Sequence, residues 1–300
     1  MTKNTLIVIV GPTGIGKTDL GIHLAQKLDT EIISADSRQF YNELKIGTAV
    51  PTNEELQKVK HHFIGNKSIH DYYNASSFEF EVIDLLSRLF KVKNPLILLG
   101  GSGMYVDAVC QGIDDLPEID MEIRNHLIEK YENEGIESLR FELKKLDPDY
   151  YEVADLKNHK RLLKALEITM MTGQPYSSFR KKVIKKRDFS VLKIGLNIKR
   201  SVLYQRIDQR VDNMIENGLV KEAREFLPLK NLNSLNTVGY KELFPYFEGE
   251  YSLDRAIELI KRNSRRYAKR QLSWFNRDKE INWFNPDESE KIFSFVNKNL

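Results

Sequence analysis

The fold is decided by one glycine-rich segment near the start of the chain, Gly11-Pro12-Thr13-Gly14-Ile15-Gly16-Lys17-Thr18. It follows an apolar, β-branched run at 6–10 and precedes leucines at helical spacing in 18–28. The order of strand, G-x-x-x-x-G-K-[S/T] and helix is that of a phosphate-binding loop. All eight residues are therefore predicted to bind phosphate, with Lys17 neutralising charge and the Thr18 hydroxyl ligating Mg²⁺. The motif alone leaves open a nucleoside triphosphate or another diphosphate.

The remaining sequence alternates strands with helices, which is typical of a parallel sheet covered on both faces. The strands are expected at 6–10, 31–34, 95–99, 191–198 and 281–284, and helices at 18–28, 82–90, 201–217 and 253–275. Between 118 and 172 the pattern is helical throughout. We predict an α/β, P-loop NTPase-like core formed by 1–111 and 187–300, interrupted by an all-helical insertion domain at 112–186.

Composition excludes several classes of protein. The 300 residues are 41% hydrophobic and 30% charged, which is ordinary for a globular chain and excludes a wholly disordered one. Apolar runs are too short for a membrane span, and 6–10 is too short for a signal peptide. The single cysteine, Cys110, excludes an intramolecular disulfide and a cysteine-based zinc module. We expect an inert, buried thiol, a cytoplasmic protein and no membrane partner.

Charge is unevenly distributed along the chain. The net charge is −9 over 112–155, +9 over 156–187 and +6 over 255–270. Such asymmetry suggests a polyanionic partner bound by selected faces, although solvated helix faces would look the same in sequence.

Asp36 directly follows the second expected strand. Ligands of open α/β sheets bind at the carboxyl ends of strands, so this carboxylate could organise Mg²⁺ or act as a general base. A turn or N-cap aspartate is the alternative. The adjacent His61 and His62 would project apart and have no evident third ligand, so we interpret them as structural.

Several strings occur together over nearly the whole chain. Besides the phosphate loop they are DSRQFY at 36–41, IGTAVP at 46–51, HHF at 61–63, GGSGMY at 100–105, TVGYKE at 237–242 and NSRRYAKRQ at 263–271. In these the chain closely resembles the bacterial tRNA dimethylallyltransferases, also called tRNA isopentenyltransferases. Ser102 stands where that family usually has threonine, and Phe40 where it commonly has an aliphatic residue. Because the chain has one cysteine, we expect it to lack the C-terminal zinc finger that many eukaryotic relatives carry.

The resemblance implies transfer of a dimethylallyl group from dimethylallyl diphosphate to N6 of the adenosine 3′ to the tRNA anticodon, with Mg²⁺ and release of diphosphate. We expect a monomer. Asp36 is the candidate base, Lys17 and Thr13 act at the donor, and an arginine of 200–217 contacts the diphosphate. Arg206 is our favoured candidate, with Arg210 one turn later on the same helix face. By the same resemblance or by its charge, a larger set is expected to contact tRNA: Asp36, Ser37, Arg38, Gln39, Ser102, Arg124, Lys160, Arg161, Leu162, Leu163, Lys164, Arg265 and Arg266. Tyr240 is a further candidate, because its ring could stack on a base, and packing inside the protein is the alternative.

Three other functions share parts of this pattern. An ATP-dependent small-molecule kinase would use the same nucleotide-binding loop. An adenylate isopentenyltransferase would need neither the charged insert nor the basic C-terminal helix. An RNA-binding protein with a vestigial loop is disfavoured, because Gly16, Lys17, Thr18 and Asp36 are all intact.

Overall fold

The computed structural model describes residues 4–114, 116–117, 120–181 and 184–300. Residue contacts divide the chain into two compact units, one formed by 1–111 with 186–300 and the other by 112–185. The boundary after the insert lies one residue earlier than the sequence predicts. We call the first the core unit and the second the insert unit.

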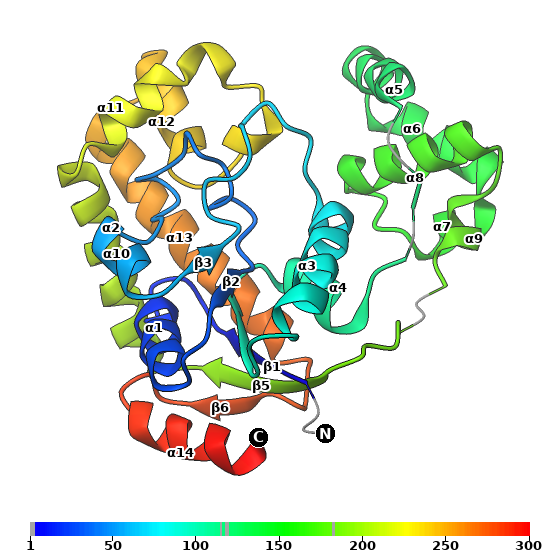
Figure 1. Cartoon of the computed structure of the whole chain (residues 1–300). Coiled ribbons are helices and arrows are strands. Elements are labelled where there is room, and N and C mark those ends of the chain that lie inside the picture. The colour runs from blue at the N-terminus through cyan, green and yellow to red at the C-terminus, as the bar shows by residue number, and fades with distance from the viewer. Residues whose placement is uncertain (1–3, 115, 118–119, 182–183) are drawn as a thin grey trace. The chain divides into compact units, whose positions relative to one another are not determined.

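The core unit is built on a parallel sheet of six strands in the order β3-β2-β4-β1-β5-β6 (Figure 1). The strands are β1 (Thr5–Val10), β2 (Ile32–Ser34), β3 (His61–His62), β4 (Leu96–Gly100), β5 (Ser190–Leu196) and β6 (Asn282–Phe284). In the central strand β1, Leu6 lies opposite Leu96 on one side and Val191 on the other. Every residue of β1 is buried, which explains its unbroken apolar run.

The sequence predicts five of these strands to within about two residues at most ends, and it misses β3. This edge strand has only two residues, His61 and His62. His62 contacts the Glu31 carboxylate at 2.7 Å, and His61 Nδ1 lies 2.8 Å from the Val59 carbonyl oxygen. Both histidines thus make local contacts that fit the structural role we predict, and no cluster of three or more metal-ligating side chains occurs among the described residues.

Helices pack around this sheet. They are α1 (Lys17–Lys27), α2 (Asn53–Lys58), α3 (Ala75–Leu89), α4 (Gly103–Gln111) and α14 (Ser289–Asn299). Residues of α1 and α14 form one hydrophobic cluster with Ile7 and Ile9 of β1. Helix α3 begins seven residues before the predicted start, because Asn74 caps it by accepting hydrogen bonds from the Ser76 and Ser77 amides.

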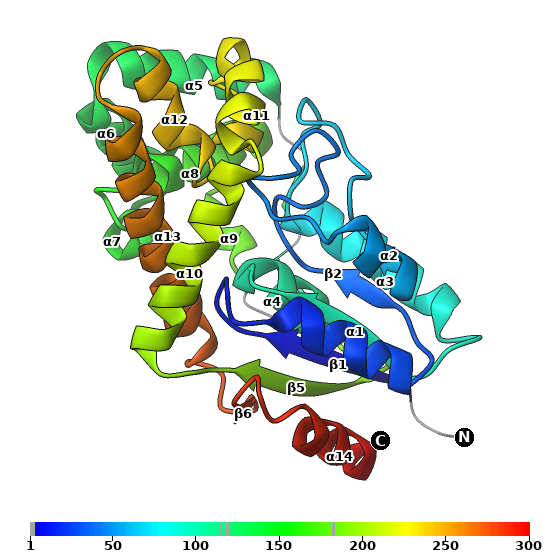
Figure 2. The ribbon, with the colours of Figure 1, turned by 90° about the vertical axis from the view of Figure 1, so that its left-hand side faces the viewer.

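A second group of helices follows β5 and carries much of the candidate site. It comprises α10 (Arg200–Glu216), α11 (Leu219–Glu225), α12 (Tyr240–Phe247) and α13 (Leu253–Phe275), with short 3₁₀ turns at Leu227–Leu229 and Asn233–Leu235. Helix α13 packs against both α10 and α12, and Figure 2 shows α10 and α13 side by side. The sequence predicts α10 and α13 but not α11 or α12.

The insert unit is entirely helical over its described residues, as predicted. Its helices are α5 (Met121–Glu134), α6 (Ile136–Leu146), α7 (Pro148–Val153), α8 (His159–Thr172) and α9 (Tyr176–Phe179). They enclose their own hydrophobic core, which includes Leu127, Leu139 and Leu166. The fully buried carboxylate of Asp147 caps α7 and accepts from both the amide and the hydroxyl of Ser177. Residues 118–119, at the predicted start of the helical stretch, lie outside the described residues.

Two predictions from composition can be compared with the structure. Among the described residues, none of the helices combines the length and the apolar character that a membrane crossing requires. Cys110 is buried on α4, and burial raises the pKa of its thiol to about 12, so it is inert at neutral pH as expected.

Candidate active site

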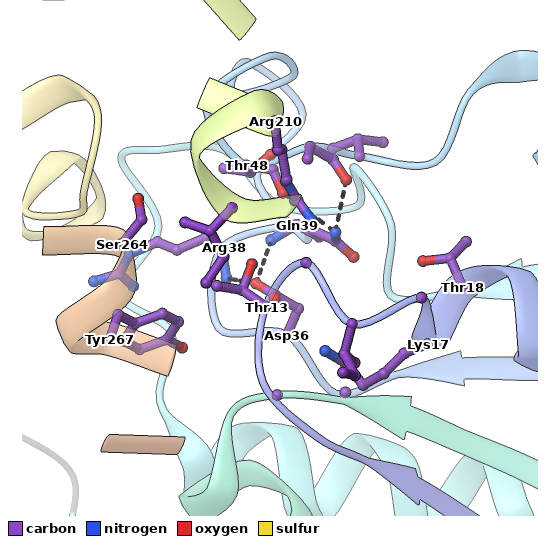
Figure 3. Close-up of a pocket in the computed structure, with 18 of the residues that line it drawn as sticks. Thr13, Lys17, Thr18, Asp36, Arg38, Gln39, Thr48, Arg210, Ser264 and Tyr267 are labelled. Atoms are coloured by element: carbon purple, nitrogen blue, oxygen red, sulfur yellow. Dashed lines mark hydrogen bonds between the residues drawn. The ribbon is translucent and has the colours of Figure 1, made fainter. Parts of the chain in front are cut away.

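A cleft of about 1320 Å³ opens in the core unit where its parallel strands end. Residues of the loops after β1, β2 and β4 line it, together with side chains of α10 and α13. Ligands of open α/β sheets bind at this edge. The cleft brings together the phosphate loop and Asp36, which the sequence predicts to be neighbours (Figure 3).

Lys17 is the first residue of α1 and turns back over the phosphate loop. Its Nζ donates to the Pro12 carbonyl at 2.9 Å. Burial and, to a lesser extent, the nearby Arg210 guanidinium together lower the pKa of Lys17 from 10.5 to about 8, although Asp36 opposes the shift. An anion bound in the loop would therefore stabilise the charged form of this buried group.

This shift predicts how donor affinity depends on pH. With a pKa of about 8, Lys17 is expected to lose its charge in the ligand-free protein as the pH rises through that value. An anionic diphosphate favours the charged form, so its affinity should fall as pH rises through about 8. Calorimetric titration between about pH 7 and pH 10 with dimethylallyl diphosphate, the donor that the sequence resemblance implies, measures this. A Lys17→Arg variant should keep its affinity across the range, and a wild-type profile as flat as that of the variant would contradict the prediction.

Asp36 follows β2 and is held by its own loop. Its Oδ1 accepts from the Arg38 amide at 2.9 Å and from the Gln39 amide at 3.3 Å. No described residue donates to the other carboxylate oxygen. Asp36 is therefore fixed through one oxygen, while the second remains available to a ligand, as a general base requires. The turn role that the sequence leaves as an alternative is also present, in the same side chain.

The two arginines of α10 are placed differently. Arg210 is half-buried and lines the cleft beside Asp36 and Lys17, and desolvation lowers the pKa of its guanidinium although Asp36 opposes the shift. Arg206 also lines the cleft, but its guanidinium lies 3.7 Å from the Asp287 carboxylate. Arg200 is farther along and stacks on Tyr204. The geometry therefore favours Arg210, rather than Arg206, as the cation facing the loop and the base.

Helix α13 contributes contacts to which the sequence pattern assigns no role. The buried Gln271 accepts from the Thr13 amide at 2.8 Å and donates to the Gly101 carbonyl at 2.9 Å. A Cβ at Gly101 would clash with Gln271 Nε2, so only glycine allows this approach. Gln271 thus joins the phosphate loop to the loop after β4. The one feature of the sequence that could have pointed to Gln271 is its position at the end of the NSRRYAKRQ string. The basic residues of that string suggest RNA contacts and draw attention away from the glutamine.

Tyr267 and Ser102 form a second link. The Ser102 hydroxyl accepts from the Ser37 amide at 2.9 Å and lies within hydrogen-bonding reach of Tyr267. Burial and the neighbouring Asp36 raise the pKa of Tyr267 to about 12. Ser102 is itself buried and Tyr267 lines the cleft, so both shape the wall next to Asp36.

The structure corrects one residue of the expected RNA-contact set in the core unit. Tyr240 is fully buried, and its hydroxyl donates to Glu222 at 2.6 Å. Its ring is therefore not accessible to a base that could stack on it. Arg38 lines the cleft and donates to the Ser37 and Asn233 carbonyls.

The basic residues of α13 fall into two groups. Lys261 and Arg265 face α10, where they pair with Asp212 and Asp208. A second line is exposed and has no acidic partner among the described residues: Arg262, Arg266, Lys269 and Arg270. Of these two groups, only the second, which we call the basic line of α13, offers unpaired charge to a polyanion.

In the insert unit the expected contact residues also divide. Lys160 and Arg161 are exposed in the first turn of α8. Arg124 and Lys164 approach the buried Glu167 carboxylate at 3.3 and 3.9 Å. Leu162 is fully buried in the core of the insert, and Leu163 packs against that core. Leu162 is thus corrected to a packing residue, because it lies on the apolar side of α8.

Comparison with known proteins identifies the family. Residues 39–278 match the family model described as IPP transferase. The chain belongs to this family. The match spans both units, and relatives along the full length extend it to the phosphate loop and Asp36. A tRNA dimethylallyltransferase 1 of Bacteroides fragilis is 53% identical over all 300 residues and over its own full length. A tRNA dimethylallyltransferase 2 of Parabacteroides distasonis is 52% identical over 297 residues, 99% of each chain.

Solved structures of tRNA prenyltransferases are similar to this IPP transferase. A tRNA isopentenylpyrophosphate transferase of Bacillus halodurans is 35% identical with a TM-score of 0.71, covering 99% of this chain and 96% of that one. A eukaryotic dimethylallyltransferase, described as acting on tRNA, is 25% identical with a TM-score of 0.79, covering 98% of this chain and 79% of that one. The P-loop NTPase-like fold expected from the sequence is confirmed, and the protein is a prenyltransferase rather than a kinase.

Proposed function

We propose that the protein transfers a dimethylallyl group from dimethylallyl diphosphate to N6 of the adenosine 3′-adjacent to the anticodon in tRNA, releasing diphosphate. The observation that carries this is the cleft in which a carboxylate with one free oxygen, Asp36, faces a phosphate loop in an IPP transferase. We further propose that the protein acts as a monomer in the cytoplasm.

Asp36 is the base of the proposed reaction. The adenine amine is a weak nucleophile, because its lone pair is delocalised into the ring. Its nitrogen attacks the first carbon of the dimethylallyl group, the bond from that carbon to the diphosphate oxygen breaks, and the proton of the amine passes to Asp36. The hydrogen bonds from Arg38 and Gln39 hold the carboxylate in place during the transfer.

The departing diphosphate gathers negative charge, and three features of the cleft can stabilise it. These are the Lys17 ammonium, the backbone amides of the phosphate loop at the N-terminus of α1, and the Arg210 guanidinium. Thr13 lies next to Asp36 in Figure 3 and lines the same cleft, so it would lie close to both the donor and the base. The Thr13 amide donates to Gln271, and this hydrogen bond attaches the tip of the loop to α13.

The residues of the cleft fit a Mg²⁺ ion held mainly by the donor. Mg²⁺ usually keeps few protein ligands and binds phosphates and water. The Thr18 hydroxyl lines the cleft and makes no hydrogen bond to a described residue, so it is available as a ligand. When bound, Mg²⁺ would offset charge on the diphosphate.

The acceptor base must leave its stack to reach Asp36, and the splayed loop must then be held by cations. In the core unit, the basic line of α13 is our candidate for this task, and its support is that Arg270 also lines the cleft. In the insert unit, the exposed Lys160 and Arg161 are the corresponding candidates.

The two groups on α13 predict a contrast in salt dependence. Replacing Arg262 and Arg266 by alanine should weaken tRNA binding and lower the slope of log affinity against log salt by about 0.7–0.9 per lost phosphate contact. Replacing Lys261 and Arg265 removes the same charge, but these cations are already paired, so the slope should change less. Filter binding at several salt concentrations measures both. Equal slopes for the two double variants would contradict the assignment.

The function is tested by incubating the protein with unmodified tRNA and dimethylallyl diphosphate, followed by nucleoside mass spectrometry. We expect dimethylallyladenosine next to the anticodon. Parallel reactions with AMP, ADP and ATP as acceptors address the adenylate isopentenyltransferase alternative. Prenylation of a free nucleotide but not of tRNA would overturn the proposal.

A further inference from the structure

A single carboxylate, that of Glu222 on α11, binds the loop that forms one wall of the cleft. Its Oε2 accepts from the amides of Lys45 and Ile46 at 3.2 and 2.9 Å, and its Oε1 accepts from the Gly47 amide at 3.0 Å. A fourth hydrogen bond comes from the Tyr240 hydroxyl at 2.6 Å. Three consecutive backbone donors thus converge on one side chain that is distant in sequence.

Packing makes this attachment rigid. The Tyr240 ring is fully buried against Gly47, and a Cβ on Gly47 would come within 2.5 Å of that ring. The loop therefore lies directly on α12 with no space for a side chain between them. Glu222 and Tyr240 together fix the position of residues 45–47 relative to α11 and α12. We call these residues the clamped loop.

The clamped loop leads directly to the candidate base. The carbonyls of the next two residues, Thr48 and Ala49, accept from Gln39 Nε2 at 3.3 and 3.0 Å. The Gln39 amide in turn donates to Asp36, and its side-chain oxygen accepts from Ser34 on β2. An unbroken series of contacts thus runs from α11 through the clamped loop and Gln39 to the Asp36 carboxylate.

We propose that Glu222 is a positioning residue for prenyl transfer: by holding the clamped loop it fixes Gln39, and through Gln39 the acceptor side of the cleft around Asp36. This rests on the proposed function. Glu222 does not line the cleft itself, whereas 47–51 do, so it acts on the acceptor through the loop. The phosphate loop is bound by Gln271 instead, so donor binding should not depend on Glu222.

Glu222→Gln tests this with little change in size. A neutral amide has one oxygen acceptor, and its NH₂ group would face a backbone N–H donor, so it cannot satisfy the same donors. We expect the single-turnover rate with saturating tRNA and dimethylallyl diphosphate to fall ~10- to 100-fold, in line with the cost of misplacing reacting groups. The donor Kd should stay within about twofold of wild type. Glu225→Gln, on the exposed face of the same helix, is the matched control and should behave as wild type.

Two readouts separate positioning from general stability. Amide hydrogen exchange over 42–52 should accelerate in Glu222→Gln but not in Glu225→Gln. In a double-mutant cycle with Gln39→Ala, the two losses of rate should combine to less than their product, because both changes break one series of contacts. A rate for folded Glu222→Gln within twofold of wild type, or fully multiplicative losses, would overturn the proposal.

Should Glu222→Gln fail to fold, Tyr240→Phe decides the question. It removes only the fourth hydrogen bond, and we expect a smaller fall in rate with faster exchange over 42–52. A wild-type rate and exchange pattern for Tyr240→Phe would then overturn the proposal. Wild-type protein that prenylates no tRNA would instead refute the proposed function, so the two failures are distinguishable.

Discussion

Asp36→Asn is expected to slow prenyl transfer by ~10²–10⁴-fold, the usual cost of losing a general base. Asparagine keeps a carbonyl oxygen that can accept from the Arg38 and Gln39 amides, so the loop after β2 should retain its shape. What it loses is the oxygen that has no donor among the described residues and that takes the proton in the proposed mechanism. The measurement is a single-turnover reaction with saturating tRNA and donor.

In Asp36→Asn, the rate of transfer should fall while the binding affinities stay nearly unchanged. The phosphate loop and the basic line of α13 are unchanged, so the affinities for donor and tRNA should stay close to wild type. Asp84→Asn, at an exposed position of α3, serves as the control and should leave the rate unaffected. A wild-type single-turnover rate for Asp36→Asn would remove this residue from the mechanism.

Local patterns in the sequence account for the centre of the site. Strand β1 is buried on both faces, which an unbroken apolar run encodes directly. The phosphate loop has a fixed spacing and Asp36 follows a strand, so the sequence is sufficient to predict that both lie at one edge of the sheet. The helical insert can be predicted from the sequence as well, because α5 to α9 have helical periodicity and no pattern typical of strands.

What the sequence does not reveal has one physical cause, which is packing between distant segments. Arg206 and Arg210 are one turn apart on α10, and only the tertiary structure shows that Asp287 engages Arg206 while Arg210 faces Asp36. Tyr240 and Leu162 match positions expected to contact RNA, but the former packs on Gly47 and the latter on the core of the insert.

The same cause hides the residues that support the site. Gln271 bridges to Thr13 across 258 positions of sequence, and Glu222 reaches Ile46 of the clamped loop across 176. A glutamine in a basic helix and a glutamate in a charged one have no periodicity or spacing that reveals such bonds. Their roles become visible only when the donors and acceptors of buried groups are matched one by one.

Lys17→Ala is expected to lower both donor affinity and the rate of transfer. The ammonium is the cation of the phosphate loop, and the lowered pKa of Lys17 is consistent with a charge that lacks full compensation before an anion binds. The diphosphate carries charge in the bound state and gains more as it leaves, so losing Lys17 weakens both states, and the transition state more strongly. We expect the rate at saturating donor to fall ~10²–10³-fold, comparable to the loss of one transition-state donor.

The control for Lys17→Ala lies on the same helix. Lys27 ends α1 and pairs with Glu290 on α14, so Lys27→Ala removes an equal charge and a salt bridge away from the cleft. Its donor affinity and transfer rate should match wild type. Lys17→Arg restores the charge but not the shape of the ammonium, and should recover donor affinity more fully than rate, because the alignment of the leaving group depends on geometry. Titration with dimethylallyl diphosphate, paired with single-turnover transfer to tRNA, measures the two quantities separately. Unchanged values for Lys17→Ala in both would mean that the diphosphate binds outside the loop, which would also remove the reason for Arg210 and Asp36 to face it.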